Sequence, residues 1–190
     1  GVTTIVGACD VRNGKSYIEQ LVINRDGSIM GRHSKTGLAS IDRSWASPGK
    51  TLKVFRDRGL DFGCLVCNDL WVVPLSGAQE DTRLSLKLAN KGARVIFCSS
   101  YSGSDQRFRE MHESNVMLRA MEGHLFIVSV NVTVPGPVNA VTGIMGPDGR
   151  WVKTCNRRGK QLVYADIMIP PLKSLFAKEE DGFIYARRGR

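Results

Sequence analysis

A short apolar run that ends on a cysteine constrains this chain more than any other stretch. Residues 62–66 read Phe-Gly-Cys-Leu-Val, and Cys67 follows with the polar residues Asn68 and Asp69 directly behind it. An apolar run of this length with polar residues after it predicts a buried strand. Cys67 then lies where the strand ends and the chain turns, which is a common place for a nucleophile. Taken alone, a cysteine in an apolar run is more often a small buried hydrophobic residue, so the rest of the chain must decide its role.

Length and composition predict a single domain with a hydrophobic core. The chain has 190 residues, of which 42% are hydrophobic, and this is sufficient to bury a core in one domain. We expect the domain to span residues 1–170 and a C-terminal tail to span residues 171–190. No apolar run approaches the length of a membrane span, and the first residues lack the pattern of a secretory signal. We therefore expect no contact with a membrane.

The five cysteines do not resemble a disulfide framework, because they are odd in number and irregularly spaced. A reducing compartment, most simply the cytoplasm, is therefore expected. Cys64 and Cys67 have the spacing of a redox or zinc pair. Side chains three residues apart on a strand point to opposite faces, however, and no second pair of Cys or His residues completes a tetrahedral site. The sequence accordingly predicts no metal and no cofactor.

The net charge of +9 raises the question of nucleic-acid binding. The basic residues are scattered, apart from a dense group at 187–190 and the pair Arg157 and Arg158. No platform of aromatic and basic residues accompanies them, so a nucleic-acid partner is not favoured. The three histidines are also scattered, and the pair His112 and Glu113 is expected to lie on a solvated helix face, although lining a pocket remains an alternative.

Hydrophobic periodicity and turn residues predict strands and helices in a mixed order, which indicates an α/β layered sheet. Phe108, Met111, Leu118 and Met121 recur at helical spacing, and residues 76–79 have the spacing of a helix capping box. The expected strands cover residues 1–8, 17–23, 28–33, 52–55, 62–66, 95–98, 124–131, 141–145, 150–153 and 161–167. The expected helices run from 76 to about 92 and from 108 to about 122. The first strand is apolar and is expected to be central and buried.

Six short motifs, taken in this order, resemble those of the nitrilase, or carbon–nitrogen hydrolase, superfamily. They are the stretches at 29–38 (Ile-Met-Gly-Arg-His-Ser-Lys-Thr-Gly-Leu), 63–69 (Gly-Cys-Leu-Val-Cys-Asn-Asp), 92–97 (Gly-Ala-Arg-Val-Ile-Phe), 119–122 (Arg-Ala-Met-Glu), 128–131 (Val-Ser-Val-Asn) and 142–149 (Thr-Gly-Ile-Met-Gly-Pro-Asp-Gly). The Cys-Asn-Asp form is most similar to the N-carbamoyl amino acid amidohydrolase branch. The resemblance implies an α-β-β-α sandwich, here lacking its first strand and helices.

The resemblance also assigns roles to four residues. Cys67 is expected to attack as a thiolate and to form an acyl-enzyme that water later cleaves. Lys35 and the backbone N–H of Asn68 would stabilise the oxyanion. The family has a supporting glutamate between the lysine and the cysteine, and the matching position here is Asp42, which is one methylene shorter. The motif after Cys67 also departs from the family, because Pro74 is followed by Leu75 instead of glutamate.

The family's general base, a glutamate upstream of the lysine, has no match in this chain, since Glu19 falls in an expected hairpin strand. Two explanations remain open: the chain is part of a longer enzyme, which its abrupt apolar beginning favours, or it is a naturally short and catalytically silent form that serves binding or assembly. The sequence thus predicts a cofactor-free hydrolase of a small amide or N-carbamoyl amine, and the resemblance implies a homo-oligomer. The loops at 99–110 and 132–140 are expected to determine the substrate.

Overall fold

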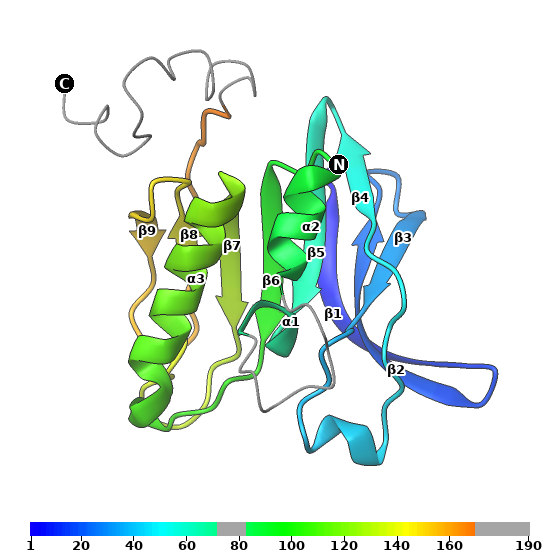
Figure 1. Ribbon diagram of the computed structural model, residues 1–190, viewed down its shortest axis with the longest axis horizontal. Coiled ribbons are helices and arrows are strands. Elements are labelled where there is room, and N and C mark those ends of the chain that lie inside the picture. Colours follow the sequence, from blue (N-terminus) through cyan, green and yellow to red (C-terminus); the bar gives the residue numbers. More distant parts are fainter. Residues whose placement is uncertain (72–82, 170–190) are drawn as a thin grey trace.

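The computed structural model describes residues 1–71 and 83–169, which form two β-sheets and a layer of helices (Figure 1). The first sheet is antiparallel and has the strand order β1-β2-β3. The second sheet has the order β4-β5-β6-β7-β8-β9. The strands are β1 (Thr4–Arg12), β2 (Lys15–Ile23), β3 (Ile29–Ser34), β4 (Val54–Asp57), β5 (Leu60–Val66), β6 (Val95–Ser100), β7 (Phe126–Asn131), β8 (Gly143–Met145) and β9 (Trp151–Thr154).

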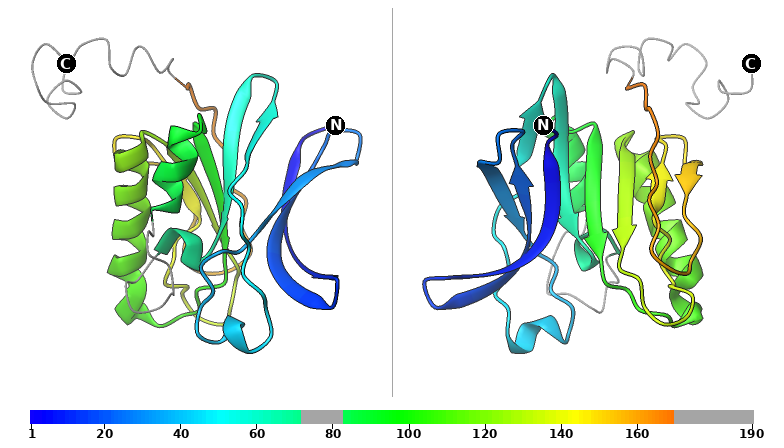
Figure 2. Two further views of the ribbon diagram at one scale, coloured as in Figure 1. Left: turned by 45° about the vertical axis from the view of Figure 1, so that its right-hand side comes forward. Right: turned by 180° about the vertical axis from the view of Figure 1, so that it is seen from behind.

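The helices cover one face of the second sheet, and the first sheet packs on its opposite face (Figure 2). They are α1 (Asn68–Trp71), α2 (Leu84–Asn90) and α3 (Arg109–Gly123), with short 3-10 turns η1 (Asp42–Ser44) and η2 (Gln106–Phe108). The mixed α/β layered architecture predicted from the sequence is therefore confirmed. None of the described helices is both long enough and apolar enough to cross a membrane.

Two hydrophobic clusters hold the layers together. The helix-side cluster lies between the helices and the second sheet, and Leu65, Leu88 and Ile96 are among its fully buried members. The inter-sheet cluster contains Val22 of β2 and Phe62 of β5. Successive residues of β5 point alternately into the two clusters, as a strand that is covered on both faces requires. This explains why the sequence of β5 is an unbroken apolar run.

The middle of the second sheet is parallel, and this places three strand ends at one edge. β5 pairs with β6, and β6 pairs with β7, both in parallel register. Val66 at the end of β5 is opposite Ser99, and Ser100 is opposite Asn131. Residues that follow these strands therefore gather at the carboxyl edge of the sheet, where ligands of open α/β sheets usually bind.

Most of the predicted elements are present, including the hairpins with turns at 24–27 and 146–149. The first strand, however, is not central: β1 forms the edge of the first sheet among the described residues, and much of it is exposed. Residues 161–167 do not form the predicted strand either. Their alternate apolar residues, such as Ala165 and Ile167, pack on the inter-sheet cluster, but this segment joins no hydrogen-bonded ladder. The capping box at 76–79 lies outside the described residues.

Helix α3 is present where the sequence predicts it, but it buries a different face. Phe108 and Leu118 of the predicted apolar stripe are about half exposed, at 47% and 52%. The buried face instead carries His112, Val116, Arg119 and Ala120. Arg119 on this face has a partner inside the fold, because its Nη1 donates to Glu122 Oε1 at 2.9 Å. Hydrophobicity alone therefore could not identify the buried face.

Candidate active site

Cys67 lies at a sharp turn between a strand and a helix. It follows the last residue of β5, its backbone is in the left-handed region with φ of 49°, and helix α1 begins at the next residue, Asn68. Its N–H donates to the carbonyl of Ser99 at 2.8 Å, and its own carbonyl accepts from Leu70 N–H at 3.0 Å. A left-handed conformation is costly for a residue with a side chain, and such positions cluster at functional sites. The half-buried thiol is thus held at the carboxyl edge of the sheet.

Lys35 and Asp42 form a buried ion pair near the end of β3. The Lys35 ammonium donates to Asp42 Oδ2 at 2.6 Å, and the two residues are only 4% and 8% exposed. Asp42 begins the turn η1 and also accepts the N–H of Ala39 at 2.8 Å. The shorter aspartate at this position therefore reaches the lysine, although its role in catalysis stays a prediction.

The carboxylate of Asp69 connects the lysine segment to the cysteine turn. Oδ1 accepts the N–H groups of Thr36 and Gly37, at 2.9 and 2.6 Å. Oδ2 lies 2.8 Å from Nε2 of His33 and accepts the N–H of Val66 at 3.0 Å. Residues on either side of Lys35 are thus bound to a carboxylate that lies two positions after Cys67.

His33 and Asp69 are the functional candidates that the sequence analysis missed. His33 precedes Lys35 by two positions, but no local pattern distinguishes a histidine that will find a carboxylate 36 residues further on. Asp69 could have been identified in part from the sequence, because an acidic residue in the first turn of a helix is well placed to accept hydrogen bonds from nearby N–H groups. Only the packing of the first sheet on β5 brings the two side chains together.

Cys64 and Cys98 are buried, whereas Cys67 is only half-buried. Cys64 belongs to the inter-sheet cluster, and burial raises the pKa of its thiol to about 12. Cys98 belongs to the helix-side cluster, and burial again raises its pKa, with a smaller contribution from the nearby Cys67. Cys67 packs against the helix-side cluster, so the two cysteines of the Cys-x-x-Cys motif do contact different clusters. Within residues 1–71 and 83–169, no group of three His, Cys, Asp or Glu side chains could hold a metal ion.

His112 lies inside the fold, so the expectation of a solvated helix face is wrong for this residue. Its ring packs edge-on to Trp71 of α1, with 4.5 Å between the ring centroids. Burial lowers the pKa of His112 to about 4, and the positive charge of Arg157 adds to the effect. Arg157 itself donates to Glu113 and to the carbonyls of Val138 and Asn139. Arg157 therefore connects the segment after β9 to α3 and to the 138–139 loop. Because its guanidinium is used in these contacts, a role for Arg157 in binding nucleic acid is less favoured.

A pocket of about 210 Å³ lies at the carboxyl edge beyond the end of β7. It is lined by residues of the predicted substrate loop, including Val132 and Thr133, and by the segment from Cys155 to Gln161. Cys67 is not among its lining residues. The pocket therefore borders the sheet edge that carries the candidate site, but Cys67 does not line it.

The comparisons with known proteins agree with this architecture. The family model described as "Carbon-nitrogen hydrolase" matches residues 1–174. An (R)-stereoselective amidase from Pseudomonas sp. is 29% identical over 130 residues, which cover 68% of this chain and 43% of that amidase. The chain therefore spans less than half the length of this curated relative.

Solved structures share the fold at low sequence identity. A glutamine-dependent NAD+ synthetase from Acinetobacter baumannii has a TM-score of 0.73 at 17% identity, covering 84% of this chain and 30% of that one. A mutant amidase from Nesterenkonia sp. AN1 has a TM-score of 0.69 at 15% identity, covering 83% and 58%. A Saccharomyces cerevisiae protein of branch 10 of the nitrilase superfamily has a TM-score of 0.67 at 16% identity, covering 82% and 55%. On the family match and on its nitrilase-type α/β fold, this chain belongs to the carbon–nitrogen hydrolase family.

Proposed function

We propose that this chain carries the nucleophile and the oxyanion-binding part of an amidase-type hydrolase. The observation that supports this most directly is the set of four hydrogen bonds made by the Asp69 carboxylate. They hold the segment that carries Lys35 against the turn that carries Cys67. A cation and a thiol held on adjacent rigid segments are two of the groups that acyl transfer through cysteine uses.

In the proposed reaction, the Cys67 thiolate attacks the carbonyl carbon of an amide or N-carbamoyl amine. The carbonyl oxygen takes the negative charge and is stabilised by the Lys35 ammonium and the backbone N–H of Asn68. The C–N bond then breaks as the nitrogen accepts, through the general base, the proton that the Cys67 thiol has lost. The nitrogen leaves as an amine or ammonia, and Cys67 retains the acyl group as a thioester. Water cleaves the thioester, which releases the acid and returns the free thiol. Asp42 orients Lys35 and balances its charge in this scheme.

Two comparisons support this substrate class. The curated relative is described as an amidase. The Nesterenkonia structure is described as showing covalent addition of the acetamide moiety of fluoroacetamide at the active-site cysteine of that enzyme. Amides are therefore the first substrates to test, and N-carbamoyl amines are the second, because the Cys-Asn-Asp motif resembles the carbamoylase branch.

Turnover would also need a proton shuttle, for which the resemblance implies a glutamate upstream of the lysine that has no match in this sequence. The reaction of the Cys67 thiol with an electrophile can therefore be measured separately from complete hydrolysis of a substrate. We expect the thiol of this chain to react with electrophiles, whereas turnover requires a general base that this chain does not match. A chain whose Cys67 is no more reactive than an ordinary thiol would support the catalytically silent alternative instead.

The test uses fluoroacetamide as the probe and intact-mass and peptide mass spectrometry as the readout. We expect one acetamide adduct, located on Cys67, and no adduct in Cys67→Ala. Cys155→Ala is the matched control, because it removes another partly exposed thiol and should leave the adduct in place. An adduct spread evenly over Cys9, Cys67 and Cys155 would contradict the proposal.

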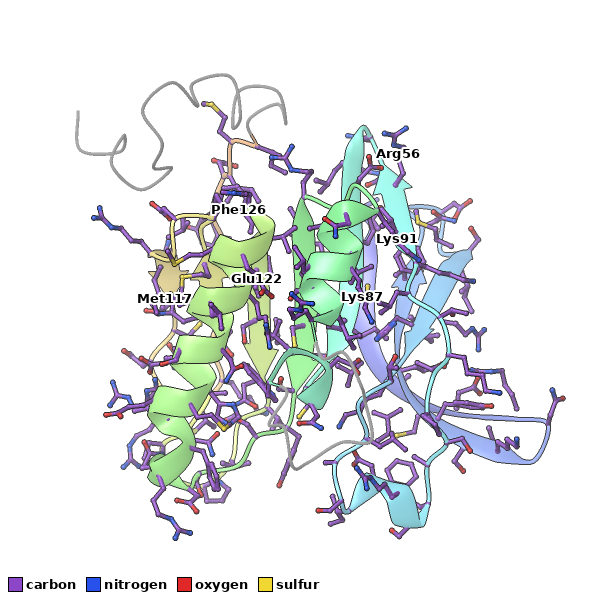
Figure 3. All side chains as sticks on the ribbon, in the orientation of Figure 1. Arg56, Lys87, Lys91, Met117, Glu122 and Phe126 are labelled. Carbon is purple, nitrogen blue, oxygen red and sulfur yellow. The ribbon has the colours of Figure 1, made fainter. Side chains whose placement is uncertain are left out.

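A cytoplasmic location and a homo-oligomer are further parts of the proposal. The described residues leave an apolar area on α3, where Met117 is 42% exposed and Leu118 is 52% exposed. Figure 3 places Met117 on the side of α3 that faces the β8–β9 hairpin. Sedimentation velocity across a range of concentrations measures the oligomeric state directly, and a single monomeric species throughout would argue against self-association.

A further inference from the structure

Asp69 is among the most deeply buried charged residues of the described chain, with an exposed fraction of 1%. Its four hydrogen-bond donors come from two segments that are far apart in sequence. Three donors belong to residues 33–37, which surround Lys35, and the fourth is the N–H of Val66, immediately before Cys67. A buried carboxylate needs hydrogen-bond donors to compensate for the loss of water. We call Asp69 and its four donors, which lie where the two sheets meet, the Asp69 joint.

We infer that Asp69 and His33 are positioning residues that hold Lys35 in place for Cys67, an inference that rests on the proposed function. The main chain of Lys35 is fixed on its other side by β2 and the loop, since its N–H donates to Ile18 at 2.7 Å and its carbonyl accepts from Gly49 at 2.8 Å. Its ammonium is bound by Asp42. The connection to the cysteine turn is therefore made by Asp69.

The hydrogen-bonding pattern explains why this position needs a carboxylate and not an amide. All four partners donate: three are backbone N–H groups, and the His33 ring presents Nε2, which carries the hydrogen because a carboxylate can only accept. An asparagine has almost the same shape but replaces one oxygen by an NH₂ group. In place of Oδ1, this NH₂ group would face the N–H groups of Thr36 and Gly37. In place of Oδ2, it would face the N–H of Val66 and the His33 ring. Asp69→Asn therefore breaks the joint with little change in volume.

The negative charge of Asp69 and its proposed role in positioning Lys35 predict opposite changes in the pH at which Cys67 reacts when Asp69 is replaced. The inference can therefore be tested. A buried negative charge near Cys67 disfavours the thiolate, so neutralising Asp69 would by itself lower the pH at which Cys67 becomes reactive. If Asp69 instead acts by holding Lys35 near the thiol, losing the joint removes the stabilising cation and raises that pH. The positioning role predicts a rise.

The experiment measures the rate of iodoacetamide alkylation at Cys67 against pH in the full chain, resolved by peptide mass spectrometry. We expect Lys35→Met to raise the midpoint and to slow alkylation of Cys67 about tenfold at pH 7. Asp69→Asn should move the midpoint in the same direction. The double variant Lys35→Met/Asp69→Asn should show no rise beyond Lys35→Met, because without the lysine Asp69 has no cation to hold in place and only the loss of its negative charge remains.

The failures of the two proposals can be distinguished. If Lys35→Met leaves the profile unchanged, the proposed role of Lys35 fails, and the inference fails with it. If Lys35→Met shifts the midpoint but Asp69→Asn lowers it, or if the two shifts add in the double variant, the inference alone is overturned. Asp166→Asn, on an exposed carboxylate, is the matched control and should match the wild type.

A pair of His33 variants tests the same joint if Asp69→Asn does not fold. His33→Gln keeps an N–H donor within reach of Asp69, whereas His33→Leu removes it. We expect the first to retain most of the wild-type profile and the second to shift the midpoint upward. Cys64 and Cys98 should stay unlabelled in both, which verifies that the core is intact. Identical profiles for the two variants would overturn the inference.

Discussion

The ion pair between Lys35 and Asp42 is expected to contribute to stability, apart from the catalytic role that we propose for Lys35. Both side chains are nearly excluded from solvent, with 5% and 11% of their area exposed. Removing one member of such a pair leaves the other charge buried without compensation.

We therefore expect Lys35→Met to lower the free energy of unfolding by about 3 kcal/mol. Urea denaturation at pH 7 measures the change. Lys50→Met, at an exposed lysine, is the matched control and should stay within about 0.5 kcal/mol of the wild type. Equal losses in the two variants would mean that the buried pair contributes no more than a surface lysine.

His112 makes stability depend on pH. Burial against Trp71, together with the charge of Arg157, lowers its pKa to about 4 in the folded protein, whereas the ordinary value is 6.5. Between these two values the unfolded chain binds a proton that the folded chain does not. Stability from this residue is present above pH 6.5 and is lost as the pH falls toward 4.

His112→Phe keeps an aromatic ring against Trp71 and removes the titration. We expect the loss of unfolding free energy between pH 7 and pH 4.5 to be smaller in this variant than in the wild type by about 2 kcal/mol. Urea unfolding curves at several pH values measure the difference. Parallel pH dependences in the two proteins would show that His112 does not titrate differently on folding.

At the scale of elements, strand β5 illustrates what a sequence pattern can and cannot predict. The apolar run at 62–66 correctly predicts the strand, its burial and the position of Cys67 at its end. It does not predict how little space is left beside Gly63, where an added Cβ would lie 2.8 Å from Leu88 and 2.9 Å from Ile96. That space is determined by side chains from two other elements.

Gly63→Ala is therefore expected to overpack the helix-side cluster and to lower the free energy of unfolding by about 1–3 kcal/mol. Thermal or urea unfolding provides the measurement. Gly7→Ala on β1 is the matched control, because a Cβ there would meet only Ser99 Oγ at an ordinary 3.7 Å. It should be neutral or slightly stabilising, and a loss at Gly7 as large as at Gly63 would contradict the packing argument.

At the scale of the whole molecule, the two buried thiols report on the two clusters separately. Cys64 lies between the sheets and Cys98 lies beneath the helices, and burial raises the pKa of both thiols. Both should resist alkylation at neutral pH until the protein unfolds.

If the layers form one cooperative unit, Cys64 and Cys98 should become reactive at the same urea concentration, coincident with the loss of circular dichroism. Pulsed alkylation followed by peptide mass spectrometry measures both midpoints. The exposed Cys9 is the internal control and should react equally at every concentration. Separate midpoints for Cys64 and Cys98 would show that the first sheet detaches before the helix layer unfolds.

The sequence by itself determined the α/β class, most strands, the turns at 24–27 and 146–149, and the position of Cys67 at a strand end. These depend on local periodicity and on turn residues, which neighbouring positions in the chain specify. The family resemblance then selected Lys35, Asp42 and Asn68 as candidates, and the match to the carbon–nitrogen hydrolase family confirmed the family without testing these residues.

Only the tertiary structure decided the buried face of α3, the edge position of β1, the unpaired course of residues 161–167, and the Asp69 joint. Each depends on a partner from a distant part of the chain: a helix face is buried by whatever packs on it, a strand needs a neighbour to form a ladder, and a carboxylate needs donors that converge from several elements. The candidate nucleophile, Cys67, could be found in the sequence because a strand end is a local feature. The groups that hold its surroundings in place could not, because they come together only when the two sheets pack.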